Sequence, residues 1–216
     1  MNRAILFDFD GTLADTLPIC FYAFQSVFKK FDNKDLAQEE IKAMFGPSEI
    51  GIIRENLSHA DQDQAVELYY EQYSDYHNQF VKQNKEINNL IGYLKEERMK
   101  LGIVTGKASR SLEISLKALQ MDHVFDVIIT GDDVSIPKPH PEGINKALSQ
   151  LGVPPRDAIF IGDSDADIQA GIQANVYTVG VNWLPDYTAP EFTYKPDYSV
   201  HSVSEFIDFV TQHTSK

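Results

Sequence analysis

Two groups of aspartates follow apolar runs that lie far apart in the chain. Asp8 and Asp10 follow the run 4–7, and Asp163 and Asp167 follow a similar run late in the chain. Side chains two residues apart on a strand share a face, so Asp8 and Asp10 should both project beyond its carboxyl end. If the two runs form neighbouring strands, three or four of these carboxylates converge on one small volume. Their repulsion then requires a cation, and oxygen ligands indicate a hard one, Mg²⁺.

Each group of aspartates also has a simpler interpretation. Alone, the first fits a strand followed by an Asx turn, and the second fits a strand followed by a helix N-cap. The second also imitates the start of a calcium-binding EF-hand loop, because Asp163, Asp165 and Asp167 alternate. That loop needs Gly at its sixth position and Glu at its twelfth, where this chain has Ile168 and Ala174. The EF-hand interpretation fails, and the role of Asp165 stays open.

A third segment has the residue types that bind phosphate. Thr105, Gly106 and Lys107 follow an apolar run and precede a helix-like segment. A hydroxyl and the backbone N–H groups at a helix start can bind phosphoryl oxygens, and the helix N-terminus adds favourable potential. The segment is not a Walker loop, because Leu101 and Ala108 replace its first Gly and its Ser or Thr.

A lysine held among three prolines is the fourth candidate. Lys138 lies between Pro137 and Pro139, and Pro141 follows shortly after. A rigidly held ammonium beside a carboxylate cluster can stabilise both a nucleophilic aspartate and an anionic substrate. Considered alone, Lys138 fits a solvated side chain in a proline-stiffened loop better.

Short apolar runs alternate with helix-like segments through most of the chain. The runs lack polar alternation, which is typical of strands buried on both faces of a parallel sheet. The predicted strands are 4–7, 101–104, 127–129, 158–161, 177–181 and, more weakly, 197–200. The predicted helices between and after them are 89–99, 109–120, 142–151, 167–175 and 202–213. The sequence therefore predicts an α/β fold with a doubly wound, Rossmann-like parallel sheet.

The stretch between the first two predicted strands shows helical periodicity instead. Aromatic and aliphatic residues recur at helical spacing in 21–31 and again in 66–80, with shorter helical pieces at 39–44 and 48–57. We interpret residues 16–82 as an inserted α-helical cap domain, and residues 1–15 and 83–216 as the α/β core domain. The aromatic stripes are assigned to the core of the insertion.

The charge balance narrows the class of partner. The chain has 216 residues, 32 acidic against 19 basic, and a formal net charge of −13. This field disfavours nucleic acid and membrane surfaces, but it allows a small phosphorylated metabolite if the site supplies its own cations. The single cysteine fits a reducing compartment, and the early carboxylate at Asp8 does not fit a secretory signal. We expect a cytoplasmic protein, either a monomer or a homodimer.

Taken together and in order, the four segments resemble the four motifs of the haloacid dehalogenase (HAD) superfamily. The motif residues are Asp8-Phe9-Asp10-Gly11-Thr12, Thr105, Lys138 and Gly162 to Asp167. The helical insertion resembles the C1 cap of subfamily I, and residues 8–18 together with Lys107 are similar to phosphoglycolate phosphatases and related pyrophosphatases.

The resemblance implies a Mg²⁺-dependent phosphatase that hydrolyses a small phosphomonoester, such as phosphoglycolate, through an aspartyl phosphate. Asp8 would be the nucleophile and Asp10 the acid and base. The catalytic residues would be Asp8, Asp10, Thr105 and Lys138, the metal site Asp8, Asp10, Asp163 and Asp167, and the phosphate site Thr105, Gly106 and Lys138. In the cap and at the mouth of the site, we expect Thr16 at the hinge, Gly46, Pro47 and Ser48 in a turn, and Lys107 as substrate-binding residues.

Several alternatives remain open. A pyrophosphatase or 5′-nucleotidase would share these motifs. True dehalogenases of the superfamily lack an acidic residue at the position that Asp10 occupies here, so phosphorus chemistry is preferred. Phosphomutases of the β-phosphoglucomutase type carry a His and an Arg where this chain has Cys20 and Glu49, and the missing cation disfavours that activity. From another class, a regulator could bind phosphate without turnover. The roles of Arg54 and Trp183 are not assigned.

Overall fold

The computed structural model describes residues 4–187 and 191–214. Within these residues, six strands form one sheet in the order β3-β2-β1-β4-β5-β6, and every neighbouring pair is parallel. The strands are β1 (Ala4–Phe7), β2 (Lys100–Val104), β3 (Val127–Ile129), β4 (Ala158–Gly162), β5 (Tyr177–Val181) and β6 (Tyr198–Val200). This is the doubly wound order, which confirms the predicted fold class.

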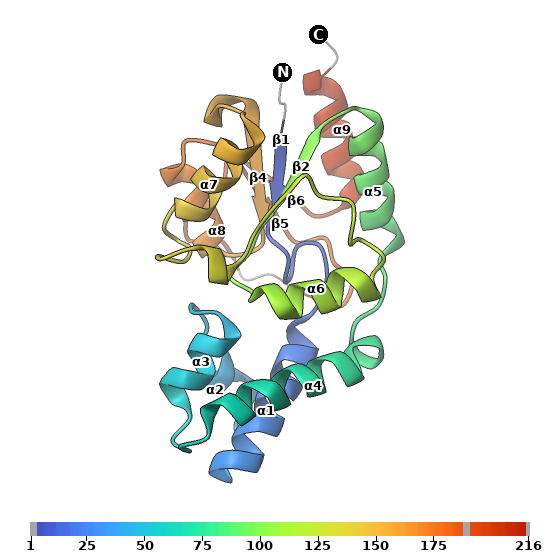
Figure 1. Cartoon of the computed structure of the whole chain (residues 1–216). Helices are drawn as coiled ribbons and strands as arrows, with labels where there is room; N and C mark the ends of the chain where they lie inside the picture. The colour runs from blue at the N-terminus through green and yellow to red at the C-terminus, as the bar shows by residue number, and fades with distance from the viewer. Residues whose placement is uncertain (1–3, 188–190, 215–216) are drawn as a thin grey trace.

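Helices cover both faces of this sheet, as Figure 1 shows. Residues of β1 alternate between two apolar clusters: Ile5 and Phe7 pack on one face, and Ala4 and Leu6 on the other. The first face is covered by α5 (Lys85–Glu96), α6 (Ser109–Ala118) and α9 (Val203–Thr214), and the second by α7 (Glu142–Leu151) and α8 (Asp165–Gln173). Short 3₁₀ turns lie at Gly131–Asp133 and Pro155–Asp157. Burial on both faces explains why the strands lack polar alternation.

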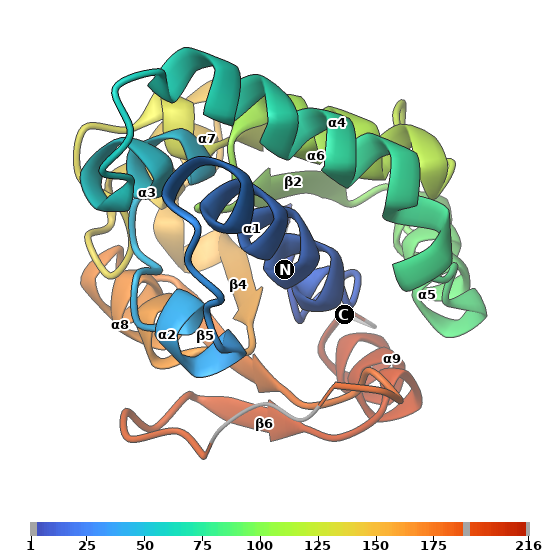
Figure 2. The same cartoon turned by 90° about the horizontal axis from the view of Figure 1, so that it is seen from below.

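The segment between β1 and β2 is helical. It contains α1 (Leu17–Asp32), α2 (Gln38–Lys42), α3 (Glu49–Asn56) and α4 (Gln62–Phe80). These helices lie beyond the carboxyl ends of the strands, and α4 packs on both α1 and α6 (Figures 1 and 2). The aromatic stripes pack within this layer, where the Phe24 and Tyr69 ring centroids are 4.6 Å apart. None of the helices in residues 4–187 and 191–214 is long and apolar enough to cross a bilayer.

Three predicted helices end too late because the chain turns into the left-handed region at residues other than glycine. Arg98, Gln120 and Asn175 have φ values of 60°, 60° and 56°. After each of them a backbone N–H bonds back across the last helical turn, which ends the helix. The starts also differ: α5 begins at Lys85 because the Asn84 side chain accepts backbone N–H groups of the first turn.

Candidate active site

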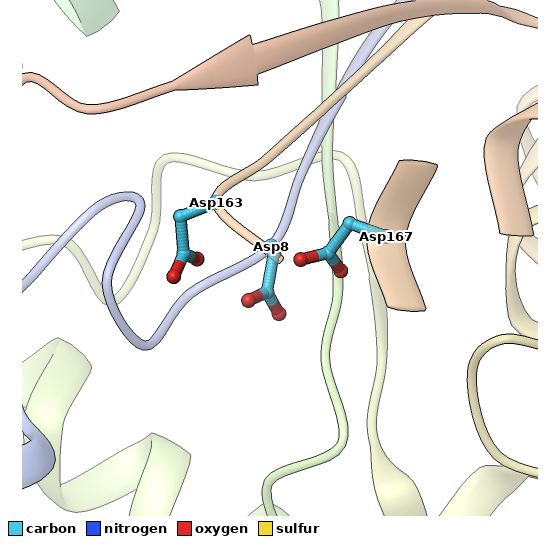
Figure 3. A group of neighbouring side chains, drawn as sticks. All are labelled: Asp8, Asp163 and Asp167. Carbon is cyan, nitrogen blue, oxygen red and sulfur yellow. The ribbon is translucent and has the colours of Figure 1, made fainter. Parts of the chain in front are cut away.

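The first and fourth strands bring the two distant aspartate groups together. In the β1–β4 pair Phe7 lies opposite Ile161, and the Asp8 N–H donates to the Ile161 carbonyl at 2.8 Å. Oxygen atoms of Asp8, Asp163 and Asp167 lie within 4.8 Å of one another, and all three residues are buried. Figure 3 shows their carboxylates turned towards one space. The site lies where the strand order reverses, the usual ligand position in such sheets.

Asp167 is oriented by the helix that it begins. Ser164 is the N-cap of α8, and its hydroxyl donates to Asp167 Oδ2 at 2.5 Å while the Ser164 N–H donates to the same atom at 3.1 Å. This capping box leaves Asp167 Oδ1 directed at the cluster. Gly162 makes the approach possible, because a Cβ there would lie 2.3 Å from the Cβ of Asp167.

Asp163 is held by two hydroxyls from other parts of the chain. Thr12 Oγ1 donates to Asp163 Oδ1 at 2.9 Å, and the Tyr187 hydroxyl donates to Asp163 Oδ2 at 2.6 Å. Gly11 has φ of 84°, and a Cβ at that position would meet Asp163 Oδ2 at 2.5 Å. Glycine is therefore required on both steric and backbone grounds.

Lys138 bridges the other two carboxylates. Its ammonium lies 2.7 Å from Asp8 Oδ1 and 2.6 Å from Asp167 Oδ1. Burial alone would lower the pKa of Lys138, but the carboxylates of Asp167 and Asp8 outweigh it and raise the pKa above its usual value. The sequence prediction that Lys138 stands beside the aspartates therefore agrees with the geometry.

The carboxylates of the cluster disfavour one another's charged forms. Burial raises the pKa of Asp8 well above its usual value, and the carboxylates of Asp167 and Asp163 add to this against the effect of Lys138. Burial, together with Asp167, also raises the pKa of Asp163 to about 6. The site therefore offers oxygen ligands from three carboxylates, and the single ammonium of Lys138 is too little to balance their charged forms. This set fits a hard divalent cation such as Mg²⁺.

Asp10 lies outside this cluster and is held from the other side. Lys107 Nζ lies 3.0 Å from Asp10 Oδ1, and the Thr16 hydroxyl donates to the same oxygen. We expected Lys107 at the mouth of the site, and the structure buries it to 4% exposure in the cavity wall. The reason is a second partner from the insertion: Glu49 Oε1 lies 3.5 Å from Lys107 Nζ. The role of Lys107 in substrate binding stays a prediction.

A cavity of about 260 Å³ joins the carboxylates to the insertion. The core lines it with Asp8, Asp10, Thr105, Gly106, Lys107, Lys138 and Asp163, and the insertion lines it with Gly46 and Pro47 among others. Among the described residues, Ser48 and Thr16 are not part of the cavity lining. Instead, Ser48 precedes α3 as its N-cap, and Thr16 precedes α1.

Thr105 and Gly106 are placed at the carboxyl end of β2, next to β1. The Thr105 N–H donates to the Ile129 carbonyl at 3.0 Å, and Thr105 Oγ1 accepts the Lys107 N–H at 3.2 Å. Thr105 is 4% exposed and lines the cavity with Gly106. The arrangement is suited to an anion bound next to Asp8.

Sequence reasoning did not assign a role to Tyr187, Thr12 or Glu49. Thr12 belongs to the quoted first motif, so its position was a usable signal. Glu49 had been noted only as the absence of an Arg. Tyr187 had no signal, because it reaches Asp163 from a loop after β5.

The residues with unassigned roles have structural partners. Asp165 Oδ1 accepts the Thr193 N–H at 2.8 Å, and Trp183 Nε1 donates to the Thr12 carbonyl at 2.7 Å. Arg54 is exposed and lies 3.5 Å from Asp63. Trp183 thus supports the loop of the first motif, whereas Arg54 lies on a solvated face.

Comparison with known proteins places this chain in one family. A family model described as haloacid dehalogenase-like hydrolase matches residues 5–181. The chain therefore belongs to the haloacid dehalogenase-like hydrolases, which confirms the family that the four motifs indicated. Pyrophosphatase PpaX of Bacillus cereus (strain AH820) is 33% identical over 212 residues, covering 97% of this chain and 96% of that protein.

Solved structures agree with this fold. The crystal structure of CbbY from Rhodobacter sphaeroides in complex with phosphate matches with a TM-score of 0.83 and 26% identity, covering 95% of this chain and 96% of that one. A predicted phosphoglycolate phosphatase from Haemophilus somnus 129pt matches with a TM-score of 0.82 and 21% identity, covering 97% and 98% of the two chains. The second likeness is one of fold alone.

Proposed function

We propose that the protein is a Mg²⁺-dependent phosphatase that hydrolyses a small phosphomonoester through an aspartyl phosphate on Asp8. The observation that carries the proposal is the buried group of Asp8, Asp163 and Asp167 with the Lys138 ammonium on two of its members. Buried carboxylates repel one another at this spacing. The arrangement is therefore suited to a site that binds a cation together with an anionic substrate.

The proposed roles follow from where each side chain lies. The Asp8 carboxylate attacks phosphorus in line with the departing oxygen, which divides the hydrolysis into two easier steps. Thr105, the Gly106 N–H and Lys138 bind the oxygens of the transferring group and stabilise its charge. Asp10 gives a proton to the leaving oxygen and then takes one from the attacking water.

The metal would be held by the side chains of Asp8 and Asp163 and by the Asp10 carbonyl, with Asp167 behind them. When bound, Mg²⁺ supplies positive charge beside the phosphoryl oxygens. The Ser164 capping box and the Thr12 hydroxyl hold the Asp167 and Asp163 carboxylates in position for it.

The domain division remains part of the proposal. We propose residues 16–82 as a cap that carries substrate selectivity, and residues 1–15 and 83–216 as the catalytic core. Residues 1–3, 188–190 and 215–216 of that core lie outside the described residues. The cavity supports this division, because the core lines it with the charged motifs and the insertion lines it with Gly46, Pro47 and apolar side chains.

Phosphoglycolate or a similarly compact phosphate is the first substrate candidate, in line with the small cavity. Pyrophosphate is the second, because the 33% identical relative is named as a pyrophosphatase. The decisive experiment measures phosphate release from p-nitrophenyl phosphate. Turnover with Mg²⁺ that disappears with a chelator supports the proposal, and binding of phosphate without turnover contradicts it.

A further inference from the structure

The Lys107 ammonium is fully occupied by groups of its own chain. It lies 3.0 Å from Asp10 Oδ1, 3.5 Å from Glu49 Oε1 and 3.4 Å from Cys20 Sγ. The ring centroid of Tyr73 is 4.8 Å away. Its side chain is 1% exposed. Lys107 therefore lines the cavity as a cation whose charge is already balanced.

Glu49 is fixed in this position from both sides. Its Oε2 accepts the Ala108 N–H at 2.6 Å, and its Oε1 accepts the Ser111 hydroxyl. Glu49 begins α3 of the insertion, whereas Ala108 is the N-cap of α6 in the core and Ser111 lies in the first turn of that helix. The residue Glu49 is 6% exposed, so solvent does not screen its carboxylate strongly. The Glu49 carboxylate thus stands in the part of the cavity formed by Lys107 and the insertion.

The remaining lining does not offer a second anion a strong partner. Lys138 is paired with Asp8, and Lys107 with Asp10 and Glu49. Lys42 also lines the cavity, but it is exposed on the insertion. Most of the other insertion residues in the wall are apolar, namely Leu17, Phe24, Phe45, Pro47 and Ile52. A second phosphoryl group would meet apolar surface, the Glu49 carboxylate and the Lys42 ammonium, whose charge solvent screens because the residue is exposed.

We propose that Glu49 is a specificity-determining residue that rejects substrates with a second phosphoryl group. Its carboxylate satisfies Lys107 in the way that the second phosphoryl group would, and it repels that group. The substrate class is then a monophosphate ester whose leaving group carries no phosphoryl group. Inorganic pyrophosphate and bisphosphates are disfavoured. This inference rests on the proposed function and narrows its substrates.

The test uses two esters that differ only in the second phosphoryl group, 3-hydroxypropyl phosphate and propane-1,3-diol bisphosphate. For the wild-type protein with Mg²⁺, we expect kcat/KM to be at least about tenfold lower for the bisphosphate, as like-charge contact in a buried site implies. In Glu49→Gln we expect the ratio of kcat/KM for the bisphosphate to that for the monophosphate to rise about tenfold, because the repelling carboxylate is gone and Lys107 keeps only Asp10 as a carboxylate partner. Glu55→Gln, an exposed glutamate on the same helix, should leave the ratio unchanged.

Pyrophosphate and p-nitrophenyl phosphate are measured alongside. Equal or better use of the bisphosphate by the wild type overturns the inference, and so does an unchanged ratio in both Glu49→Gln and the second variant, Glu49→Leu. If either variant fails to fold, the other variant and the wild-type comparison still decide. If p-nitrophenyl phosphate is hydrolysed but the bisphosphate-to-monophosphate ratio does not behave as expected, the inference is wrong and the proposed function is unaffected. No Mg²⁺-dependent hydrolysis of any ester removes the proposed function and this inference with it.

Discussion

Lys138 Nζ lies 2.7 Å from Asp8 Oδ1, although 130 residues separate the two in the chain. The same ammonium reaches Asp167 at 2.6 Å. One cation therefore ties the loop after β1 to the start of α8, at the edge where β1 and β4 end. The pair connects the proposed nucleophile to contacts that stabilise the fold. Catalysis and stability therefore need separate measurements.

Replacing the proposed nucleophile should abolish turnover and leave the fold intact. In Asp8→Asn the side chain keeps its size but loses the charged oxygen that attacks phosphorus. We expect kcat for p-nitrophenyl phosphate to fall by at least about 10³-fold. Circular dichroism should show unchanged secondary structure. Near-normal activity in a folded Asp8→Asn protein would refute the assignment of Asp8.

The proposed acid should matter most for poor leaving groups. Asp10→Asn keeps the size of the side chain and an oxygen that can contact Lys107 and Thr16, but it removes the proton donor. We expect a loss of about 10²-fold or more on an alkyl phosphate, and a much smaller loss on p-nitrophenyl phosphate. A series of aryl and alkyl phosphates provides the measurement. Equal losses across the series would show that Asp10 does not protonate the leaving group.

Removing the bridging cation should destabilise the protein. Lys138→Met leaves the buried carboxylates of Asp8 and Asp167 without their partner, which costs about 3 kcal/mol or more of unfolding free energy. Urea unfolding in a chelator measures this cost, and added Mg²⁺ should recover part of it. Lys146→Met is the matched control, because Lys146 pairs with Glu142 on the exposed face of α7. A control effect as large as that of Lys138→Met would contradict the interpretation.

Mg²⁺ should stabilise the folded state, because the carboxylate cluster exists only there. Since a ligand at about 100 times its Kd adds about 2.7 kcal/mol, we expect a clear rise of the thermal midpoint with Mg²⁺. Asp163→Asn should reduce this rise. Asp165→Asn should keep it, because Asp165 binds the backbone of Thr193 and Tyr194 instead. A midpoint that does not respond to Mg²⁺ would argue against a metal site.

Acid should destabilise the protein in part through His77. Burial, with a contribution from Lys107, lowers the pKa of His77 from 6.5 to about 4, and its Nε2 lies 3.0 Å from Ser115 Oγ. Between these two values the unfolded chain binds the proton and the folded chain does not, so stability falls as pH falls. We expect wild type to lose about 2 kcal/mol more than His77→Gln between pH 7 and pH 4.

Urea unfolding across this pH range checks the expectation. His123→Gln is the control, since that side chain is 92% exposed. Parallel pH profiles of the wild type and His77→Gln would show that His77 does not carry the effect.

The periodicity of the sequence was sufficient for the sheet and the order of the helices. The predicted strand 127–129 coincides with β3, and the predicted helix 142–151 coincides with α7. Apolar runs buried on both faces leave an unambiguous pattern, because each residue of such a strand contacts one of the two cores. The ends of α5 and α6 were missed because Arg98 and Gln120 adopt a left-handed conformation that their residue types rarely signal. Asn175 ends α8 in the same conformation, which asparagine adopts more often.

The sequence by itself also determined which residue types stand at the strand ends, and therefore which chemistry they can perform. Asp8, Thr105, Lys138 and Asp163 were all identified from local context and order. Only the tertiary structure decided the partners of these groups: Tyr187 on Asp163, and Glu49 on a buried Lys107. The physical reason is that local pattern reports burial and periodicity, whereas the charge balance of a cavity depends on contacts between segments that only folding brings together.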